Sequence, residues 1–252
     1  MLANYHTHTY RCYHASGEDR EYVEAAIRGG IKELGFSDHC PWIFQNGYVS
    51  DMRMAPQEVD LYFTSLKRLK KEYETDITIR IGFEAEYLPE LVQKQEQFLK
   101  NYPVDYMILG QHFLSPEPNC IYAGAPSKEE RYLKQYVDLI IEGMKTGKYL
   151  YVAHPDLFHF TGSNEVYELH MTRLCKFLKK NDIPVEINML GYLDHRQYPS
   201  DRFLTIAKKV GNSAIIGVDA HQPERLYDLK AQKACEEIAK KYQLPLVTQL
   251  TI

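Results

Sequence analysis

The chain has 252 residues, of which 44% are hydrophobic and 25% charged, a composition typical of a globular protein with a large core. Its net charge is −4 and it has no basic segment interleaved with aromatic residues, which argues against binding to nucleic acid or to an acidic membrane surface. The five cysteines form no C-x-x-C pair, and no apolar segment of about 18 residues occurs. We therefore expect a cytoplasmic protein with reduced thiols and no membrane span.

Short apolar segments rich in β-branched and aromatic residues alternate with longer segments of helical periodicity. The short segments predict strands over residues 2–5, 33–37, 77–84, 105–110, 149–153, 184–187 and 214–218. The longer ones predict helices over residues 18–29, 56–74, 89–101, 127–147, 164–181, 200–211 and 224–242. Glycines at the end of the first and fourth helices, prolines at the start of the second and third, and an S-K-E-E capping box at Ser127 indicate the boundaries.

Seven predicted strands, each followed by a helix, indicate parallel pairing with right-handed crossovers. Seven or eight such units close into a barrel more readily than they form an open sheet, and no G-x-G-x-x-G follows the first strand. We predict an α/β fold of the TIM-like barrel type, with residues 1–252 forming a single domain. The longest irregular regions, 40–55 and 113–126, are expected to cover a site.

Side chains that suit metal binding gather at the ends of the predicted strands. Such ends face one shared bowl in a parallel barrel, where barrel enzymes place their sites. The residues at or just after these ends, with one from the first loop, are His6, His8, His14, His39, Glu84, Glu86, His112, His154, Asp219 and His221. Imidazoles at this density predict a cluster of divalent metal ions. For His170, in a helix, and His195, in a polar loop, we expect no ligand role.

The spacing within the motifs fits metal binding. Residues i and i+2 of a strand point to the same side, so His6 and His8 can present two imidazoles to one ion. Asp219 and His221 have the same spacing, and a carboxylate such as Glu84 can bridge two ions. A set of imidazole nitrogens and carboxylate oxygens suits zinc, manganese or iron, whereas magnesium would prefer more oxygen. We expect two or three divalent ions.

These motifs resemble those of a known family. HTH at residues 6–8, SDH at 37–39, GFEAEY at 82–87, QH at 111–112, AHPD at 153–156 and VDAH at 218–221 resemble the polymerase and histidinol phosphatase (PHP) superfamily. They occur in the family's order and span nearly the whole chain. The segments HTHTYRCYHASG, HPDLF and EINMLGYLDHRQYPS are similar to the histidinol-phosphate phosphatase branch. The resemblance implies a distorted (β/α)7 barrel with a trinuclear metal site.

Carried over residue by residue, the resemblance implies three ion positions. One would take His6, His8, Glu84 and Asp219; a second would share Glu84 and take His112 and His154; the third would take His14, His39 and His221. Some family members have aspartate where this chain has His14, and that difference changes the charge of the third position.

The implied chemistry is hydrolysis of a phosphomonoester by a hydroxide that bridges two of the ions and attacks phosphorus in line. No D-x-D-x-T motif for an aspartyl nucleophile is present. The residues with expected catalytic roles are Glu84, Asp219, His221 and Arg196, and the expected substrate contacts are Arg196, Arg11, Trp42 and His159. Asp156 and Asn188 are candidates for orienting ligands, and Trp42, Tyr48 and Arg53 for a lid.

The leading functional hypothesis is hydrolysis of L-histidinol phosphate, a step of histidine biosynthesis, with L-histidinol and inorganic phosphate as products. The nearest alternative is the same chemistry on another small phosphomonoester or on phosphotyrosine. A PHP-type nuclease is disfavoured by the net charge of −4, and a non-catalytic metal-stabilised domain by the complete ligand set. The sequence does not indicate the native metal or the oligomeric state.

Overall fold

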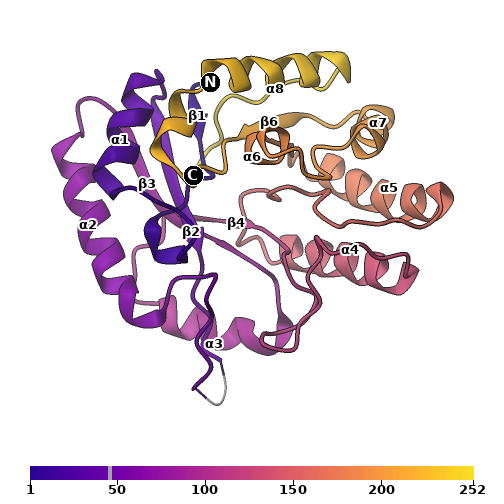
Figure 1. Cartoon of the computed structure of the whole chain (residues 1–252), viewed down its shortest axis with the longest axis horizontal. Coiled ribbons are helices and arrows are strands. Elements are labelled where there is room, and N and C mark those ends of the chain that lie inside the picture. The colour runs from indigo at the N-terminus through magenta and orange to yellow at the C-terminus, as the bar shows by residue number, and fades with distance from the viewer. Residues whose placement is uncertain (45–46) are drawn as a thin grey trace.

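The strands form a parallel sheet that curls around the centre of the molecule (Figure 1). The computed structural model describes residues 1–44 and 47–252. Strands β1 (Ala3–Asn4), β2 (Glu33–His39), β3 (Thr78–Ala85) and β4 (Tyr106–Leu109) pair in that order, and β5 (Val185–Asn188) pairs with β6 (Ala214–Gly217). All of these pairs are parallel, which confirms the predicted α/β class with a curled parallel sheet.

Single bridges connect the two groups of strands. Val152 pairs in parallel with Leu109 at the end of β4 and with Val185 at the start of β5. Within the described residues, the predicted strand over 149–153 therefore forms only isolated bridges. The reason lies at His154, whose φ of 30° ends the extended conformation and whose N–H donates to the Glu186 side chain at 2.7 Å.

Helices cover the outer face of the curled sheet (Figure 1). They are α1 (Asp19–Arg28), α2 (Val59–Glu72), α3 (Pro89–Leu99), α4 (Glu130–Lys145), α5 (Asn164–Lys180), α6 (Met189–Leu193), α7 (Asp201–Val210) and α8 (Leu229–Lys241), with 3-10 turns η1 (Tyr10–Cys12), η3 (Pro56–Glu58) and η4 (Pro223–Tyr227). Amphipathic spacing explains how they pack. In α2, for example, the buried Tyr62, Leu66 and Leu69 recur at helical intervals and form one apolar face.

Several helices differ from the predictions. The second and the last predicted helices each begin with a 3-10 turn, so α2 starts at Val59 and α8 at Leu229. The fourth predicted helix begins at Glu130 rather than at the capping box of Ser127, because the Ser127 N–H donates to the His159 carbonyl at 2.9 Å. The short helix α6 follows β5 directly, and no sequence pattern predicts it. The Asn188 side chain caps α6, which places this residue at the carboxyl-end mouth of the sheet.

The core of the described residues has three parts. The largest lies between the sheet and the helices, and a small one packs Trp42 against Leu88 and Leu91. The third fills the inside of the curled sheet with Ala3, Tyr5, Tyr106, Ile108, Tyr151, Ala153 and Ile215. Several of these residues lie at the beginnings of their strands, so the apolar filling leaves the opposite, carboxyl-end mouth to polar side chains. Of the helices in the described part of the chain, none has both the length and the apolar character needed to cross a membrane.

Candidate metal centre

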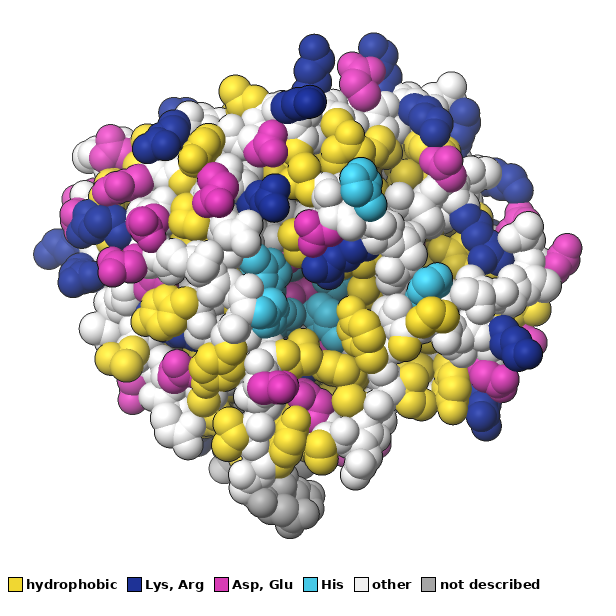
Figure 2. Space-filling view, in the orientation of Figure 1, with side chains coloured by type: hydrophobic (Ala, Val, Ile, Leu, Met, Phe, Trp, Pro, Cys, Tyr) yellow, Lys and Arg dark blue, Asp and Glu magenta, His cyan; other side chains and the backbone are white. Residues whose placement is uncertain are grey.

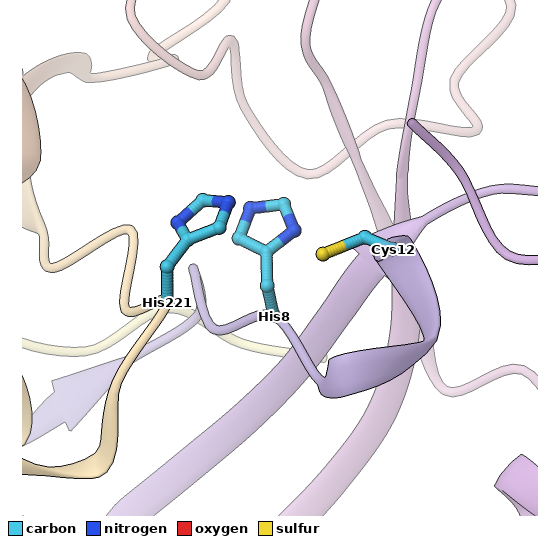
Figure 3. A group of neighbouring side chains, drawn as sticks. All are labelled: His8, Cys12 and His221. Atoms are coloured by element: carbon cyan, nitrogen blue, oxygen red, sulfur yellow. The ribbon is translucent and has the colours of Figure 1, made fainter. Parts of the chain in front are cut away.

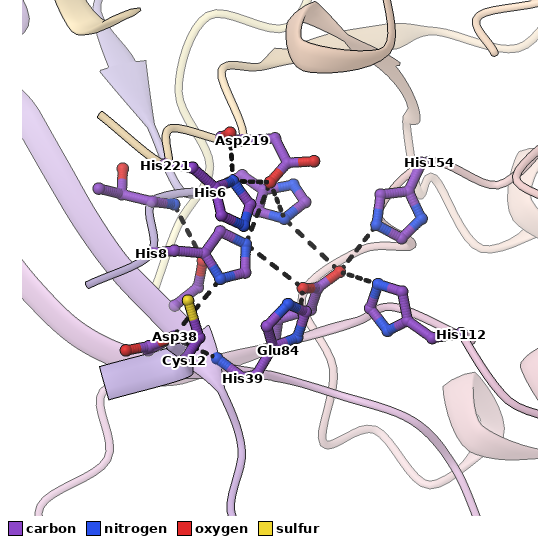
Figure 4. Close-up of polar contacts among 12 residues, drawn as sticks. His6, His8, Cys12, Asp38, His39, Glu84, His112, His154, Asp219 and His221 are labelled. Carbon is purple, nitrogen blue, oxygen red and sulfur yellow. Dashed lines mark hydrogen bonds and ion pairs between the residues drawn. The ribbon is translucent and has the colours of Figure 1, made fainter. Parts of the chain in front are cut away.

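The ligand-type side chains predicted at the strand ends converge at the mouth of the curled sheet (Figure 4). His39 is the last residue of β2, Glu84 lies in β3, and the others follow strands or bridges. We call this set the histidine–carboxylate cluster; it comprises His6, His8, His14, His39, Glu84, His112, His154, Asp219 and His221. All nine predicted ligands are therefore brought together, although they lie far apart in the chain.

His6, His8 and Asp219 form the tightest group of the cluster (Figure 4). Asp219 Oδ1 lies 3.1 Å from His8 Nε2 and 3.4 Å from His6 Nε2. The carboxylate of Glu84 closes the group, with Oε1 at 3.5 Å from His6 Nε2 and Oε2 at 3.5 Å from His8 Nε2. The ligand atoms of four side chains thus lie close together.

The carboxylate of Glu84 also faces three further histidines. Its Oε1 lies 2.9 Å from His154 Nε2 and 3.5 Å from His112 Nε2, while its Oε2 lies 3.2 Å from His39 Nδ1. Gly110 makes room for this carboxylate, because a Cβ at position 110 would collide with the Glu84 side chain. The geometry is that of a carboxylate placed between several ligand groups.

A third group lies nearer the solvent and consists of His14, His39 and His221. One ring nitrogen of His14 is bonded to the Cys12 carbonyl at 2.7 Å, and one of His221 to the Asp219 carbonyl at 3.0 Å. In both rings Nδ1 makes this bond and Nε2 is left free to act as a ligand.

Cys12 also lies beside the cluster, a position that the sequence patterns do not single out. The ring of His8 lies between His221 and the Cys12 thiol (Figure 3). Burial, with the nearby carboxylate of Asp38, raises the pKa of this thiol, and its Sγ lies 3.2 Å from the Thr9 carbonyl. The environment thus favours a protonated packing residue over a thiolate ligand.

The cluster fits divalent metal ions. Within the described part of the chain, His6 Nε2, both ring nitrogens of His8, both oxygens of Glu84 and Asp219 Oδ1 are buried without a hydrogen-bond partner. Such atoms are costly to bury unless something else pairs with them. Two ligands of one zinc ion, each at about 2.1 Å, lie roughly 3 to 3.5 Å apart in a tetrahedral arrangement, which matches the spacings above.

Three buried carboxylates support the cluster from behind; sequence reasoning assigned no role to Asp38 and Glu186 and placed Glu86 among the ligand-type side chains at the strand ends. Glu186 Oε1 lies 2.9 Å from His6 Nδ1, Asp38 Oδ1 lies 3.5 Å from His8 Nδ1, and Glu86 Oε1 lies 3.3 Å from His112 Nδ1. Each leaves Nε2 of its histidine facing the cluster, as in the carboxylate–histidine–metal arrangement of metalloproteins. The sequence contains a signal for each of them. Asp38 directly precedes the ligand His39, Glu86 lies two positions after Glu84, and Glu186 lies two positions before Asn188 in the same strand.

The electrostatics differ within the cluster: facing carboxylates outweigh burial and raise the pKa of His6, His8 and His112, whereas other members are held in their metal-binding forms. Burial raises the pKa of the Glu84 and Asp219 carboxyls, but the surrounding imidazoles outweigh burial and hold both values well below the usual range. Burial, with the ring of His8 adding to it, lowers the pKa of His39 well below its usual value and that of His221 to about 3. Ionised carboxylates and neutral imidazoles are the forms that bind metal ions.

The cluster forms the floor of an open pocket of about 340 Å³. Figure 2 shows the histidines at the bottom of a hollow, with basic side chains on its rim. The walls combine an apolar part and a polar part, formed by Met52, Tyr122, Leu157, Leu190, Asp194, Arg196, Tyr198, Gln222 and Arg225. The pocket therefore offers a charged floor and a partly apolar wall to a small molecule.

Of the expected substrate contacts, Arg196 lines the pocket, where its guanidinium donates to Tyr198 Oη and Asp194 Oδ2, both at 3.1 Å. Arg11 is buried, and its guanidinium donates to both oxygens of Asp19, at 2.8 and 2.9 Å. This pairing argues against the expected role of Arg11, because the buried carboxylate already occupies the guanidinium.

Trp42 and His159 also lie outside the lining of the pocket in the described structure. Trp42 is buried, and its Nε1 donates to Glu86 at 3.0 Å, so it packs below the surface rather than stacking on a ligand. His159 holds a loop through its backbone, accepting from the Ser127 N–H at 2.9 Å. Neither position supports the expected substrate contact.

The remaining candidates divide by what their side chains touch. Asn188 Nδ2 donates to Asp219 Oδ2 at 3.1 Å and thereby orients a cluster residue, as expected. Asp156 instead accepts from the Ser200 N–H at 2.7 Å, and burial raises its pKa to about 7. His170 pairs with Glu130 at 3.1 Å.

Fold and site together define a class of α/β proteins with a histidine-rich metal site at the mouth of a parallel sheet. The family model described as PHP domain matches residues 4–190, and the chain belongs to this family. A Deinococcus radiodurans protein named probable histidinol-phosphatase is 28% identical over 237 residues, covering 88% of this chain and 87% of that protein. The histidinol-phosphatase of Bacillus subtilis is 27% identical, covering 86% and 92%.

A solved structure supports the fold. Histidinol phosphate phosphatase from Lactococcus lactis, complexed with zinc, L-histidinol and phosphate, superimposes with a TM-score of 0.73 at 20% sequence identity. The match covers 98% of this chain and 95% of that one. At this level of identity the likeness shows a shared fold.

Proposed function

We propose that the chain is a metal-dependent phosphatase that hydrolyses L-histidinol phosphate to L-histidinol and inorganic phosphate. The observation that carries this proposal is the set of buried imidazole and carboxylate atoms, unpaired within the described residues, at the floor of an open pocket. The names of the D. radiodurans and B. subtilis relatives and the ligands of the L. lactis structure support this choice of substrate.

We propose that the cluster holds two or three divalent ions, with zinc, manganese or iron best suited to its nitrogen and oxygen donors. The first position would use His6, His8, Glu84 and Asp219; the second Glu84, His112 and His154; the third His14, His39 and His221. When bound, such ions act as Lewis acids that polarise phosphoryl oxygens and make coordinated water more acidic. Glu84 is the proposed bridge, because its two oxygens face different histidines.

The side chains around the floor would bind and orient the phosphomonoester. Arg196 would donate to the phosphoryl oxygens, since a guanidinium matches their geometry and the contacts with Asp194 and Tyr198 already fix its direction. Asp219 and His221, which line the pocket, would act in catalysis as ligands that hold the ions against the phosphoryl group. The apolar wall would receive the carbon skeleton of the alcohol and exclude water around it.

The finer architecture is also a proposal. We propose that residues 1–252 act as one domain whose sheet is a distorted (β/α)7 barrel. The segment around Val152, which bridges Leu109 and Val185, would be a further strand between β4 and β5 and bring the number of strands to seven. The bridge between Thr7 and Ala220 would close the ring. An experimental structure in which the segment around Val152 stays between β4 and β5 would support this count.

A substrate panel tests the activity. Protein purified without chelator is assayed for its metal content and for release of phosphate from L-histidinol phosphate, phosphotyrosine and several other small phosphomonoesters. We expect stoichiometric bound metal and a kcat/KM for L-histidinol phosphate at least about 100-fold above that for the other substrates, because a built site discriminates through its buried polar contacts. Equal rates on all substrates would contradict the assignment of L-histidinol phosphate. A preference for phosphotyrosine would favour the alternative substrate with the same chemistry.

A further inference from the structure

A buried arginine, Arg53, lies in the first of the two long loop regions, 40–55, and contacts the second, 113–126. Arg53 is 2% exposed, and its guanidinium contacts two carboxylates from different parts of the chain. Its two terminal nitrogens donate to Glu86 at 3.0 and 3.1 Å, and its Nε donates to Glu117 at 2.7 Å. A guanidinium this deeply buried is stable only with well-placed partners, so these contacts fix its position.

The first of these carboxylates connects Arg53 to the metal centre. Glu86 Oε1 accepts from Arg53 and also lies 3.3 Å from His112 Nδ1 (Glu86 is fully buried). The opposite nitrogen of the ring, His112 Nε2, points at Glu84 Oε1 from 3.5 Å. Glu86 therefore selects the form of His112 that carries its proton on Nδ1 and offers Nε2 as a ligand.

The second carboxylate connects Arg53 to the loops. Glu117 lies in the region 113–126, and its Oε1 accepts from Ser50 Oγ at 2.8 Å, so it ties this region to the described part of 40–55. Met52 and Tyr122 belong to the two tied regions, and both line the pocket. The contact at Glu117 thus holds two walls of the pocket together.

The charges of these groups do not cancel, because one guanidinium is shared between two carboxylates. Because Arg53 also pairs with Glu117, it neutralises Glu86 less completely. The negative charge of Glu86 therefore acts more strongly on the N–H of His112. A more negative partner makes an imidazole a stronger metal ligand.

We propose that Glu117, Arg53 and Glu86, which we call the clasp, are positioning residues that set the ligand strength of His112 and couple it to the two loops over the pocket. The inference rests on the proposed metal-dependent function, since it gives His112 a metal to bind. It extends that function to Glu117, whose side chain connects to the ring of His112 through Arg53 and Glu86.

Two isosteric variants test the clasp, Glu86→Gln and Glu117→Gln. Metal affinity is measured by competition with a chromophoric chelator, the ligand field by visible absorption of the cobalt-loaded protein, and kcat and KM with L-histidinol phosphate. We expect Glu86→Gln to weaken binding of one ion by about 10- to 100-fold, as is usual for a partner of a ligating histidine. We expect Glu117→Gln to weaken the same ion by roughly 3- to 10-fold, to change the cobalt spectrum in the same direction and to raise KM.

The chain offers a matched control in Glu72→Gln. Glu72 accepts from Arg20 at 2.6 and 2.7 Å, but this pair is exposed on the outer side of the molecule, so the variant should match wild type in affinity, spectrum and KM. If Glu117→Gln fails to fold, Ser50→Ala provides a milder variant. It removes the hydrogen bond from Ser50 Oγ to Glu117 Oε1 and should lower metal affinity by about 2-fold.

The outcomes separate the clasp from the proposed function. If wild type binds metal and hydrolyses the substrate, but Glu117→Gln and Ser50→Ala lower only thermal stability, the clasp is a structural feature and the inference is wrong. If wild type binds no divalent ion, the proposed function and the clasp fail together. Restored affinity in Glu117→Asp, which returns the charge at this position, would support the inference.

Discussion

The inside of the curled sheet has two ends of opposite character. Away from the mouth, Tyr5, Tyr106 and Tyr151 fill the interior, and each hydroxyl has a partner within the protein: Tyr106 donates to the Tyr5 carbonyl at 2.8 Å, Tyr5 to the Leu250 carbonyl at 3.2 Å and Tyr151 to Glu186 at 3.2 Å. At the carboxyl ends, the buried polar atoms of the cluster face one another without hydrogen-bond partners in the described chain.

The difference separates what holds the fold from what acts on a ligand. Satisfied buried groups at the tyrosine end contribute to folding on their own, whereas the unpaired carboxylates and imidazoles at the mouth are costly until a cation joins them. Glu186 lies at the boundary, since its Oε1 contacts both Tyr151 and His6. We therefore expect changes at the mouth to alter metal binding and turnover, and changes at the tyrosine end to alter stability.

The largest effect is expected at Glu84. Replacing it with glutamine keeps its size but removes the charge that faces five histidines, so ion binding should weaken and turnover should fall by about 1000-fold or more. Steady-state kinetics and metal analysis of the purified variant measure both effects. A Glu84→Gln variant that retained a tenth of wild-type turnover would be incompatible with a bridging role.

Glu33→Gln is the matched substitution at the other end. Glu33 is buried at the first position of β2, where it accepts from Arg80 at 2.9 Å and from Gln249 at 2.7 Å. Weakening these contacts should lower the free energy of unfolding by about 1 to 3 kcal/mol and leave kcat and metal content unchanged. A loss of turnover in the folded Glu33→Gln protein would remove the functional distinction between the two ends.

Metal removal should reveal the cost of the unpaired groups. A ligand present at 1000 times its dissociation constant stabilises the folded state by about 4 kcal/mol, so stripping the ions with a chelator should lower the melting temperature of wild type clearly. Differential scanning fluorimetry with and without chelator measures the shift. The shift should nearly vanish in Glu84→Gln and persist in Glu33→Gln; a wild-type melting temperature insensitive to chelator would contradict metal binding at the mouth.

Two glycines allow the same comparison with an added methyl group. In Gly110→Ala the new Cβ would collide with the buried Glu84 side chain, and we expect kcat/KM to fall by about 10- to 100-fold because the carboxylate must move. In Gly35→Ala the Cβ would collide with the Tyr106 hydroxyl, and we expect a loss of about 1 to 3 kcal/mol of stability with unchanged metal affinity. Kinetics, chelator competition and denaturant unfolding of both variants check the contrast; reversed effects would refute it.

The sequence predicts the fold class and the cluster because both depend on local patterns. Alternating strand and helix periodicity gives the parallel sheet, and the position of a histidine just after an apolar strand indicates the mouth. The segment 149–153 is the exception, since the left-handed backbone of His154 and its bond to Glu186 shorten the pairing. No glycine indicates such a backbone at His154 or at Asp219, which has a φ of 53°.

Contacts that depend on the packing of distant segments could not be predicted. Arg11 is close to His14 in sequence, yet the carboxylate of Asp19 captures its guanidinium once α1 folds against η1. Likewise, which histidine each supporting carboxylate meets depends on the curl of the sheet: Glu186 reaches His6 from the opposite end of the chain. The ligands are thus visible in the sequence, and the groups that orient them emerge only from the fold.

The smallest expected effect tests the tyrosine end alone. Tyr106→Phe removes the hydroxyl that donates to the Tyr5 carbonyl and leaves the ring packing in place, so the free energy of unfolding should fall by about 1 kcal/mol. Urea unfolding with and without bound metal measures this loss. Because Tyr106 lies among satisfied groups, the loss should be the same in the metal-free and metal-loaded protein. A loss that grows when metal is bound would mean that the two ends are coupled and that the tyrosine end also helps to shape the metal centre.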